Sequence, residues 1–299
     1  MGVAALLVTA LGWGLGWLAM KVVLQSWPPL FGRGLAGVTA AMLLAALALV
    51  RGEHLAVPRG ARVRLAMAAF TNVFAWMGFS ALCLRWITVG EAALLVYSMP
   101  IWATLFAWAL IGIRPTVRGF VALALGLSGI GVLLGAGGGA LSAENLPGIG
   151  FALAAAMLFA LGAVLNRAAL AMPPFALTAW QVGLGCLPMV GLGLVLERPA
   201  VTSLSGASAV AFAYMTLIPM AACYVSWFAA LRQLSPVAAS TCMLLVPLIG
   251  ILSAALLLDH LGETDAAERV EKAVVSDLAE RGAESLGTSE IGRRIRDRV

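Results

Sequence analysis

Apolar residues in this chain form nine long runs, separated by short segments rich in Gly, Pro and charged residues. A run of about 18 apolar residues with few charges predicts a membrane-spanning helix, because about 20 residues of α-helix cross a hydrocarbon core. The runs cover approximately residues 3–24, 29–50, 65–84, 89–112, 119–135, 146–167, 176–196, 207–231 and 235–258. We therefore predict an all-α membrane protein with nine spans.

The chain contains an internal repeat. Residues 81–102, ALCLRWITVGEAALLVYSMPIW, resemble residues 228–249, FAALRQLSPVAASTCMLLVPLI. At an offset of 147, the agreeing pairs are Leu84 with Leu231, Arg85 with Arg232, Ala92 with Ala239 and Pro100 with Pro247. Residues 10–21 and 156–167 agree at an offset of 146. One repeat holds five spans, and an odd number gives the second copy the opposite topology, which is the inverted-repeat plan of secondary transporters.

The repeat divides the chain into three parts. Residues 1–137 form a first five-helix repeat, residues 146–258 a second repeat with four spans, and residues 259–299 a charged tail. The repeat predicts a tenth span near residue 266, but residues 265–281 contain eight charges. Each central charge costs about 2.5–3.5 kcal/mol in a membrane helix, so no single span can hold them. We predict that an amphipathic, soluble-like helical tail replaces the tenth helix of a ten-helix fold.

Two prolines lie near the middle of predicted spans. Pro100 and Pro247 each interrupt an apolar run, and a helix proline frees the carbonyl four residues back. These carbonyls belong to Val96 and Met243, and at that depth a freed carbonyl must face protein or a water-filled cavity. We predict that both prolines are hinges beside a central cavity; the alternative is a packing kink.

Composition argues against a soluble all-helical protein. Hydrophobic residues make up 62% of the chain and charged residues 11%, whereas soluble domains contain about 25% charged residues. The four cysteines lie inside the runs and form no CxxC pair. The sequence therefore predicts no metal site, redox site or cofactor.

Arginines gather in alternate loops. The segment 51–64 and the pair Arg114 and Arg118 are basic, whereas the loop after the fifth run has no Lys or Arg. Basic loops stay in the cytoplasm, which places the N-terminus there. The net charge of +5 therefore follows from membrane topology and does not indicate nucleic-acid binding.

Four segments carry a family likeness. They are GWGLGWLAMK in the first run, FGRGLAG with Arg33 in the second, AALLVYSMPIWATLFAWALIGIRPT around Pro100 and AASTCMLLVPLIGILSAALLL around Pro247. With these segments, residues 1–258 resemble the drug/metabolite transporter superfamily, and its EamA-type branch in particular. The segment EAALLVYSMP and the tryptophan content resemble those of bacterial aromatic-amino-acid and paraquat exporters. The resemblance implies ten helices in two inverted repeats, a place in the inner membrane, and export of small metabolites by alternating access, with amino acids, aromatic ones among them, as substrates.

The tail resembles a different family. LLLDHLGETDAAERVEKAVVSDLAERG and GTSEIGRRIRDRV are similar to the C-terminal end of isopropylmalate/isocitrate-type dehydrogenases. The catalytic and cofactor residues of that family lie upstream of this segment and have no counterpart here, so we expect no enzyme activity. The tail is either a foreign splice or a native regulatory tail, and an inactive chimera is the alternative to a transporter. A membrane-embedded enzyme would need a polar catalytic cluster at one interface, which the sequence does not show.

Aromatic residues inside the spans are the candidate substrate contacts. An aromatic-lined, largely uncharged cavity would suit a flat apolar side chain, with freed carbonyls and amides meeting the amino-acid head group. The predicted substrate-binding residues are Trp17, Asn72, Trp76, Phe79, Tyr97, Trp102, Tyr214, Tyr224 and Met243. For each aromatic residue, packing or lipid contact is the alternative. We expect a small-molecule substrate and the lipid bilayer as partners.

Ionisable residues are few inside the spans, where they are functional candidates. Glu91 lies about one turn into the fourth span and is either a proton-coupling carboxylate or, as we favour, an interfacial residue. Arg33 lies nearer the interior, where it would hold a bond between helices. Because no Asp or Glu is central in a span, we expect facilitated exit down a gradient.

Overall fold

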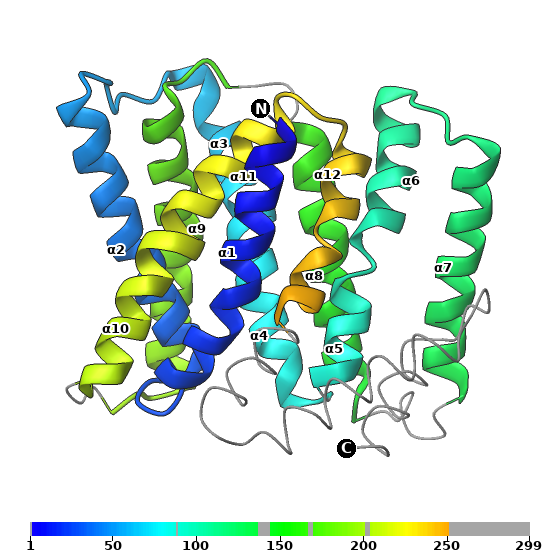
Figure 1. Cartoon of the computed structure of the whole chain (residues 1–299), viewed down its shortest axis with the longest axis horizontal. Coiled ribbons are helices and arrows are strands. Elements are labelled where there is room, and N and C mark those ends of the chain that lie inside the picture. Colours follow the sequence, from blue (N-terminus) through cyan, green and yellow to red (C-terminus); the bar gives the residue numbers. More distant parts are fainter. Residues whose placement is uncertain (1, 88, 137–143, 167–169, 201–203, 251–299) are drawn as a thin grey trace.

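The computed structural model describes residues 2–87, 89–136, 144–166, 170–200 and 204–250 of the 299-residue chain. Every regular element in these residues is a helix, and the long helices stand side by side with alternating direction (Figure 1). The first helix begins at the top of Figure 1. We call this the N-terminal side of the bundle.

The first repeat holds three continuous helices and two composite spans. The continuous helices are α1 (Gly2–Val23), α2 (Pro29–Val50) and α7 (Val117–Ala136), which lies at the edge of the bundle. The third span runs through η1 (Arg59–Ala61), α3 (Arg62–Ala69), η2 (Phe70–Phe79), α4 (Ser80–Leu82) and η3 (Cys83–Arg85). The fourth span is divided into α5 (Val89–Val96) and α6 (Met99–Ile111).

The second repeat follows the same order. Its continuous helices are α8 (Leu146–Asn166) and α9 (Pro174–Leu196). Its composite span runs through α10 (Gly206–Met215), η4 (Thr216–Ala222) and α11 (Cys223–Leu231). Helix α12 (Pro236–Cys242) opens the last apolar helical stretch, which reaches Gly250.

In the described residues, seven helices are long and apolar enough to cross a membrane. They coincide with seven of the nine predicted runs, and α7 and the stretch Pro236–Gly250 stand at the other two. The prediction of an all-α, multi-pass membrane protein is therefore confirmed. The position of the tenth span and the whole of the tail lie outside the described residues.

Helices α2 and α9 pack closely in opposite directions, because glycines let their backbones approach. A Cβ atom on Gly34 would lie 2.8 Å from the backbone nitrogen of Val190. A Cβ atom on Gly193 would lie 2.7 Å from the backbone nitrogen of Phe31. Small residues at such contacts are typical of membrane helix pairs, where van der Waals packing drives association.

The first turns of α2 and α9 are capped by glutamates that follow the other helix. Both helices begin with a Pro-Pro pair, and their N-cap prolines offer no side-chain acceptor. Glu197, just after α9, accepts hydrogen bonds from the backbone N–H groups of Leu30 (3.0 Å) and Phe31 (2.9 Å). Glu53, just after α2, accepts one from Ala176 (3.0 Å). Each carboxylate thus satisfies N–H groups that a helix start leaves without partners, and the exchange relates the two helices as an inverted pair.

Both spans that carry a central proline are broken just before it. The fourth span turns at residues 97–98, before Pro100, and the ninth turns at residues 243–244, before Pro247. The removed backbone hydrogen bond and the ring of each proline account for the break. The two breaks occupy equivalent places in the repeats, and their action as hinges stays a prediction.

Two π-helical segments also occupy equivalent places, one in each repeat. They are η2 in the third span and η4 in the eighth. Thr71 and Thr216 stand at their starts, and each hydroxyl donates to the carbonyl four residues back, at 2.9 Å. Such hydrogen bonds tend to bend helices, and π-helical turns are frequent at functional sites.

Candidate functional site

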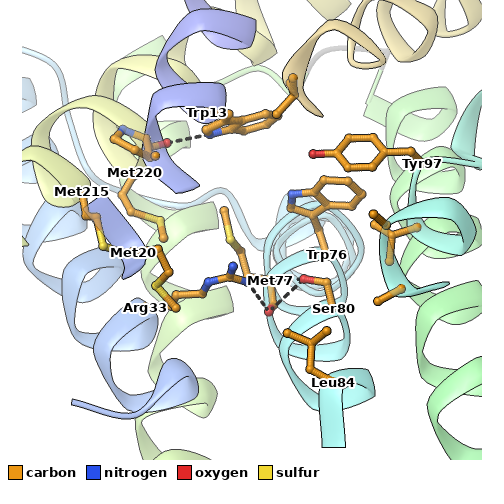
Figure 2. A pocket seen from close by; sticks show the side chains of 16 residues that line it. Trp13, Met20, Arg33, Trp76, Met77, Ser80, Leu84, Tyr97, Met215 and Met220 are labelled. Carbon is orange, nitrogen blue, oxygen red and sulfur yellow. Dashed lines mark hydrogen bonds between the residues drawn. The ribbon is translucent and has the colours of Figure 1, made fainter. Parts of the chain in front are cut away.

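A cavity of about 100 Å³ lies between the two repeats. Its wall runs from Trp13 and Trp76, near the middle of their spans, to Leu84, near the end of the third span (Figure 2). Elements α1, α2, η2 and α5 line it from the first repeat, and α10 and η4 line it from the second. The cavity therefore occupies the half of the bundle that faces away from the N-terminal side.

Three aromatic rings form one wall of the cavity. The indole N–H of Trp13 donates to the carbonyl of Pro219 (2.9 Å), which lies inside η4. The Trp76 ring stands edge-on to the Tyr97 ring, with 5.9 Å between centroids and 81° between planes. Because these contacts hold both indoles, this wall is formed before any ligand arrives.

Methionines form much of the facing wall. The four are Met20, Met77, Met215 and Met220. Methionine is flexible and polarizable, so such a wall can adapt its shape. An engineered cavity of about 150 Å³ holds benzene, so this cavity is of comparable but smaller size, and flexible methionines can widen it.

Arg33 is the one charged residue among those that line the described cavity. Its Nη1 donates to the carbonyl of Met77 and to the hydroxyl of Ser80, each at 3.4 Å (Figure 2). These long, weak bonds join α2 to the third span, as expected for Arg33 from the sequence. The guanidinium lies beside the methionines, in a wall that is otherwise almost entirely apolar.

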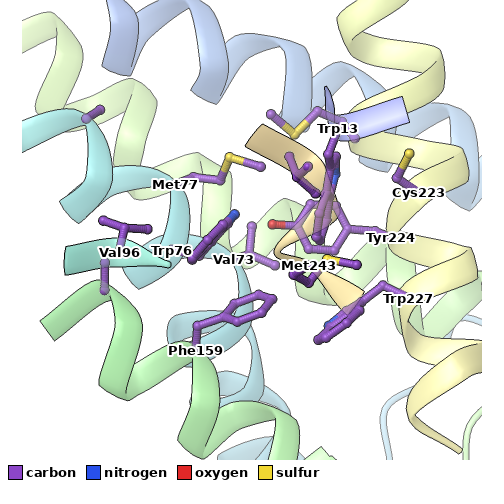
Figure 3. Packing of buried hydrophobic residues seen from close by; sticks show 14 of the residues in the cluster. Trp13, Val73, Trp76, Met77, Val96, Phe159, Cys223, Tyr224, Trp227 and Met243 are labelled. Carbon is purple, nitrogen blue, oxygen red and sulfur yellow. The ribbon is translucent and has the colours of Figure 1, made fainter. Parts of the chain in front are cut away.

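Aromatic rings fill the bundle between the cavity and the N-terminal side. Phe159 stacks on Trp227, with 5.2 Å between centroids, and lies 4.5 Å from the Trp76 ring. Trp13 stands edge-on to Tyr224, at 5.4 Å. We call these five residues the central aromatic cluster (Figure 3). Tyr224 and Trp227 have no exposed surface, so the cluster closes the cavity toward the N-terminal side.

The predicted substrate-binding residues fall into three groups. Trp76 and Tyr97 line the cavity. Asn72, Tyr224 and Met243 are buried on its closed side, where the Tyr224 hydroxyl donates to the Asn72 carbonyl (3.3 Å).

The third group lies around the cavity. Phe79 packs on Phe151, with 5.4 Å between the ring centroids. The indole of Trp102 donates to Ser98 (3.0 Å), and the hydroxyl of Tyr214 donates to the Gly12 carbonyl (3.3 Å). Trp17 lies on α1, but its side chain is outside the described part of the structure.

Several lining residues were missed by the sequence reasoning. Trp13 lies one helical turn from Trp17, and this spacing could have indicated it. Pro219 lies inside an apolar run, as Pro100 and Pro247 do. The methionines carried no signal, because an apolar residue in a span is equally compatible with packing, lipid contact or a cavity.

A comparison with protein-family models identifies the chain. The model of the EamA-like transporter family matches residues 1–135 and 146–261, which together cover most of the chain. The chain belongs to the EamA-like transporter family. It is therefore a multi-pass membrane transporter of small molecules, and the family match in two segments agrees with the internal repeat.

One solved crystal structure resembles this EamA-like transporter along nearly its whole length. The TM-score is 0.66, with 20% sequence identity, and the match covers 99% of this chain and 94% of the other. At this identity the likeness supports the fold alone.

The tail of the transporter matches a different kind of protein. The 3-isopropylmalate dehydrogenase of Mycobacterium bovis (strain BCG / Pasteur 1173P2) is 59% identical over 49 residues. That of Mycobacterium sp. (strain KMS) is 57% identical over 49 residues. Each match covers 16% of this chain and 15% of the dehydrogenase. The likeness of the tail to this enzyme family is confirmed, and so short a segment of an enzyme gives no ground for its activity.

Proposed function

We propose that this transporter exports amino acids, aromatic ones among them, by alternating access between its two repeats. The cavity supports this proposal, because both repeats line it and aromatic rings close it toward the N-terminal side. A site at the interface of inverted repeats, open to one side at a time, is the arrangement that alternating access requires.

The chemistry of the wall favours an amino acid with a bulky apolar side chain. Trp76 and Tyr97 offer ring surfaces to such a side chain, and aromatic pairs favour edge-on or offset contact. The guanidinium of Arg33 matches a carboxylate, with which arginine forms short, charge-assisted hydrogen bonds. The methionine wall would then adjust to side chains of different size.

The distribution of arginines supports a cytoplasmic N-terminus in a bacterial inner membrane. Arg51, Arg59 and Arg62 lie between α2 and the first turn of α3, and Arg114 lies between α6 and α7. All of these segments are on the N-terminal side. Basic loops remain in the cytoplasm, so the cavity of the structure would face outward. Protease accessibility of an N-terminal tag in right-side-out and inverted vesicles tests this orientation.

Transport would be facilitated exit rather than ion-coupled export. The residues that line the described cavity include no carboxylate. A carboxylate in the pathway is the usual proton carrier of membrane transporters. Efflux is therefore expected to follow the substrate gradient and to be insensitive to a pH gradient.

Reconstitution tests the proposal directly. The purified chain is placed in liposomes loaded with labelled phenylalanine, and efflux is measured with and without a pH gradient. Trp76→Ala should reduce efflux about tenfold or more, because each 1.4 kcal/mol of lost contact is tenfold. Trp108→Ala is the matched control, since Trp108 is 42% exposed and packs on Phe120 away from the cavity.

Two outcomes would count against the proposal, and a third would leave folding to be separated from function. Equal loss in both tryptophan variants would indicate damage to folding. The milder Trp76→Phe variant, which keeps a ring against Phe159, then separates folding from function. Efflux that depends on the pH gradient would overturn facilitated exit, and an inserted chain without efflux would overturn amino-acid export.

A further inference from the structure

Five buried polar side-chain atoms in the described residues have no hydrogen-bond partner. One is Asn72 Oδ1, in the first repeat; the other four belong to the second repeat and share one half of the bundle. They are Asn166 Nδ2, Gln181 Oε1, Trp227 Nε1 and Ser240 Oγ. Gln181 is 1% exposed, and Trp227 and Ser240 are 0% exposed. More than nine in ten buried polar groups have a partner, so four such atoms together require an explanation.

All four lie near the N-terminal side, in the half that the central aromatic cluster closes. Asn166 ends α8, Gln181 is in the first third of α9, Trp227 is in α11, and Ser240 is in α12. In the described residues, the open half contains no buried polar side-chain atom without a partner. For example, the Ser98 hydroxyl donates to the Leu95 carbonyl (2.6 Å) and accepts from the Trp102 indole (3.0 Å).

The internal repeat relates these atoms to the open cavity. At the offsets of 146 and 147, the pairs are Met20 with Asn166, Ser80 with Trp227, and Ala93 with Ser240. The first member of each pair lines the open cavity. Three of the four residues therefore occupy, in the other repeat and the other half of the bundle, the positions that line the cavity.

A small crevice marks the same region. It has a volume of about 10 Å³ and is lined by Asn166, Gln181 and Leu231, among others. Leu231 is the repeat counterpart of Leu84, which lines the open cavity. The crevice is thus the narrow counterpart of the open cavity on the N-terminal side.

We propose that the closed half is a second solute-contacting surface, and that Asn166, Gln181, Trp227 and Ser240 line it when it opens. The inference rests on the proposed alternating access. In the closed state these groups are dry and lack partners. In the opposite state they meet water and the polar head group of the solute.

The two surfaces would differ in chemistry. The open cavity offers the Arg33 guanidinium in an apolar wall. The second surface offers amide, hydroxyl and indole N–H groups, and the exposed Arg232 is among the residues that line the crevice. Amide, hydroxyl and indole groups suit the zwitterionic head of an amino acid that enters from water, because together they can donate to its carboxylate and accept from its ammonium group.

Removing one of these polar groups tests the inference, because it should stabilise the closed state. Ser240→Ala deletes a buried hydroxyl that has no partner, and Gln181→Met replaces an amide by an apolar group of similar length. Each should raise the midpoint of thermal unfolding by about 2–4 °C. Each should also slow efflux about fivefold, since stabilising one state depopulates the other.

The matched control is Ser98→Ala, which deletes a buried hydroxyl that has two partners. It should lower the midpoint, because it leaves the Trp102 indole without its acceptor. A lowered midpoint in Ser240→Ala and Gln181→Met as well would overturn the inference, since it would show that both groups are already satisfied. A raised midpoint with unchanged efflux would also overturn it, because the groups would then have no part in opening.

The readouts separate this inference from the proposed function. Export by the unmodified chain and its loss in Trp76→Ala test the function. The ratio of efflux rates between Ser240→Ala and the unmodified chain, read together with the two midpoints, tests the second surface alone.

Discussion

The exchanged glutamate caps make a quantitative prediction about stability. Glu197 accepts two backbone N–H groups of α2, and Glu53 accepts one of α9. Loss of a capping acceptor costs about 0.5–2 kcal/mol, and an anion at a helix N-terminus adds about 0.3–1 kcal/mol. Both glutamates are partly exposed, which moves the expectation toward the middle of these ranges. We therefore expect Glu197→Ala to lower the free energy of unfolding by about 2 kcal/mol and Glu53→Ala by about 1 kcal/mol.

The assay is reversible unfolding of the purified protein in mixed micelles. Glu197→Gln keeps one acceptor oxygen but no charge, so its loss should be about half that of Glu197→Ala. The double variant should show additive losses, because the two caps lie at opposite ends of helices about 30 Å long. Gln25→Ala is the control: Gln25 is exposed and uncharged in the turn after α1, so its change should stay within about 0.5 kcal/mol. The reasoning fails if Glu197→Ala matches Gln25→Ala, or if the losses at Glu53 and Glu197 are equal.

Two further predictions concern the helix contacts and the prolines. Gly37→Ala should destabilise the protein by about 1–3 kcal/mol, because the added Cβ would collide with the Cys186 side chain. Adding Cys186→Gly should restore part of the lost stability. Gly191→Ala is the control and should leave stability unchanged, because there is open space around Gly191. A Gly37 variant as stable as the unmodified chain would contradict the close packing of α2 and α9. Pro100→Ala and Pro247→Ala should each slow efflux while leaving the unfolding midpoint unchanged or higher, because a restored helix hydrogen bond stiffens the break. Unchanged efflux in both variants would show that neither proline acts as a hinge.

The sequence was informative wherever the signal is local. The length of an apolar run decides whether a helix can span a membrane. In the described residues, a helix stands at the position of each of the nine predicted runs. A proline removes a hydrogen bond at a known position, so the breaks before Pro100 and Pro247 could be predicted to within a few residues. Pro100 and Pro247 are 147 residues apart, as are Arg85 and Arg232, and this shared distance located the repeat.

Tertiary contacts were beyond such reasoning. The bond from Glu197 to Leu30 joins residues 167 positions apart, and a glutamate in a loop gives no sign of the helix that it will cap. The π-helical segments have no sequence signature. Trp76 and Tyr97 line the cavity, but Asn72, on the same span as Trp76, and Tyr224, on the eighth span, are buried in the closed half. Which side of a membrane helix faces a cavity depends on where its neighbours stand.

The place of α7 in the bundle leads to a last prediction, about the tail. In the described structure α7 packs against α5 and α6 at the edge of the bundle, and none of the residues lining the cavity comes from it (Figure 1). The repeat assigns the equivalent edge position in the second half to the tenth span, beside α12. A helix at that edge is expected to support α12 without forming the cavity. Deleting residues 259–299 should therefore leave efflux within about twofold, the scale of a surface change. A tenfold loss from a deleted chain that still inserts would show that the tail performs the structural task of the tenth helix.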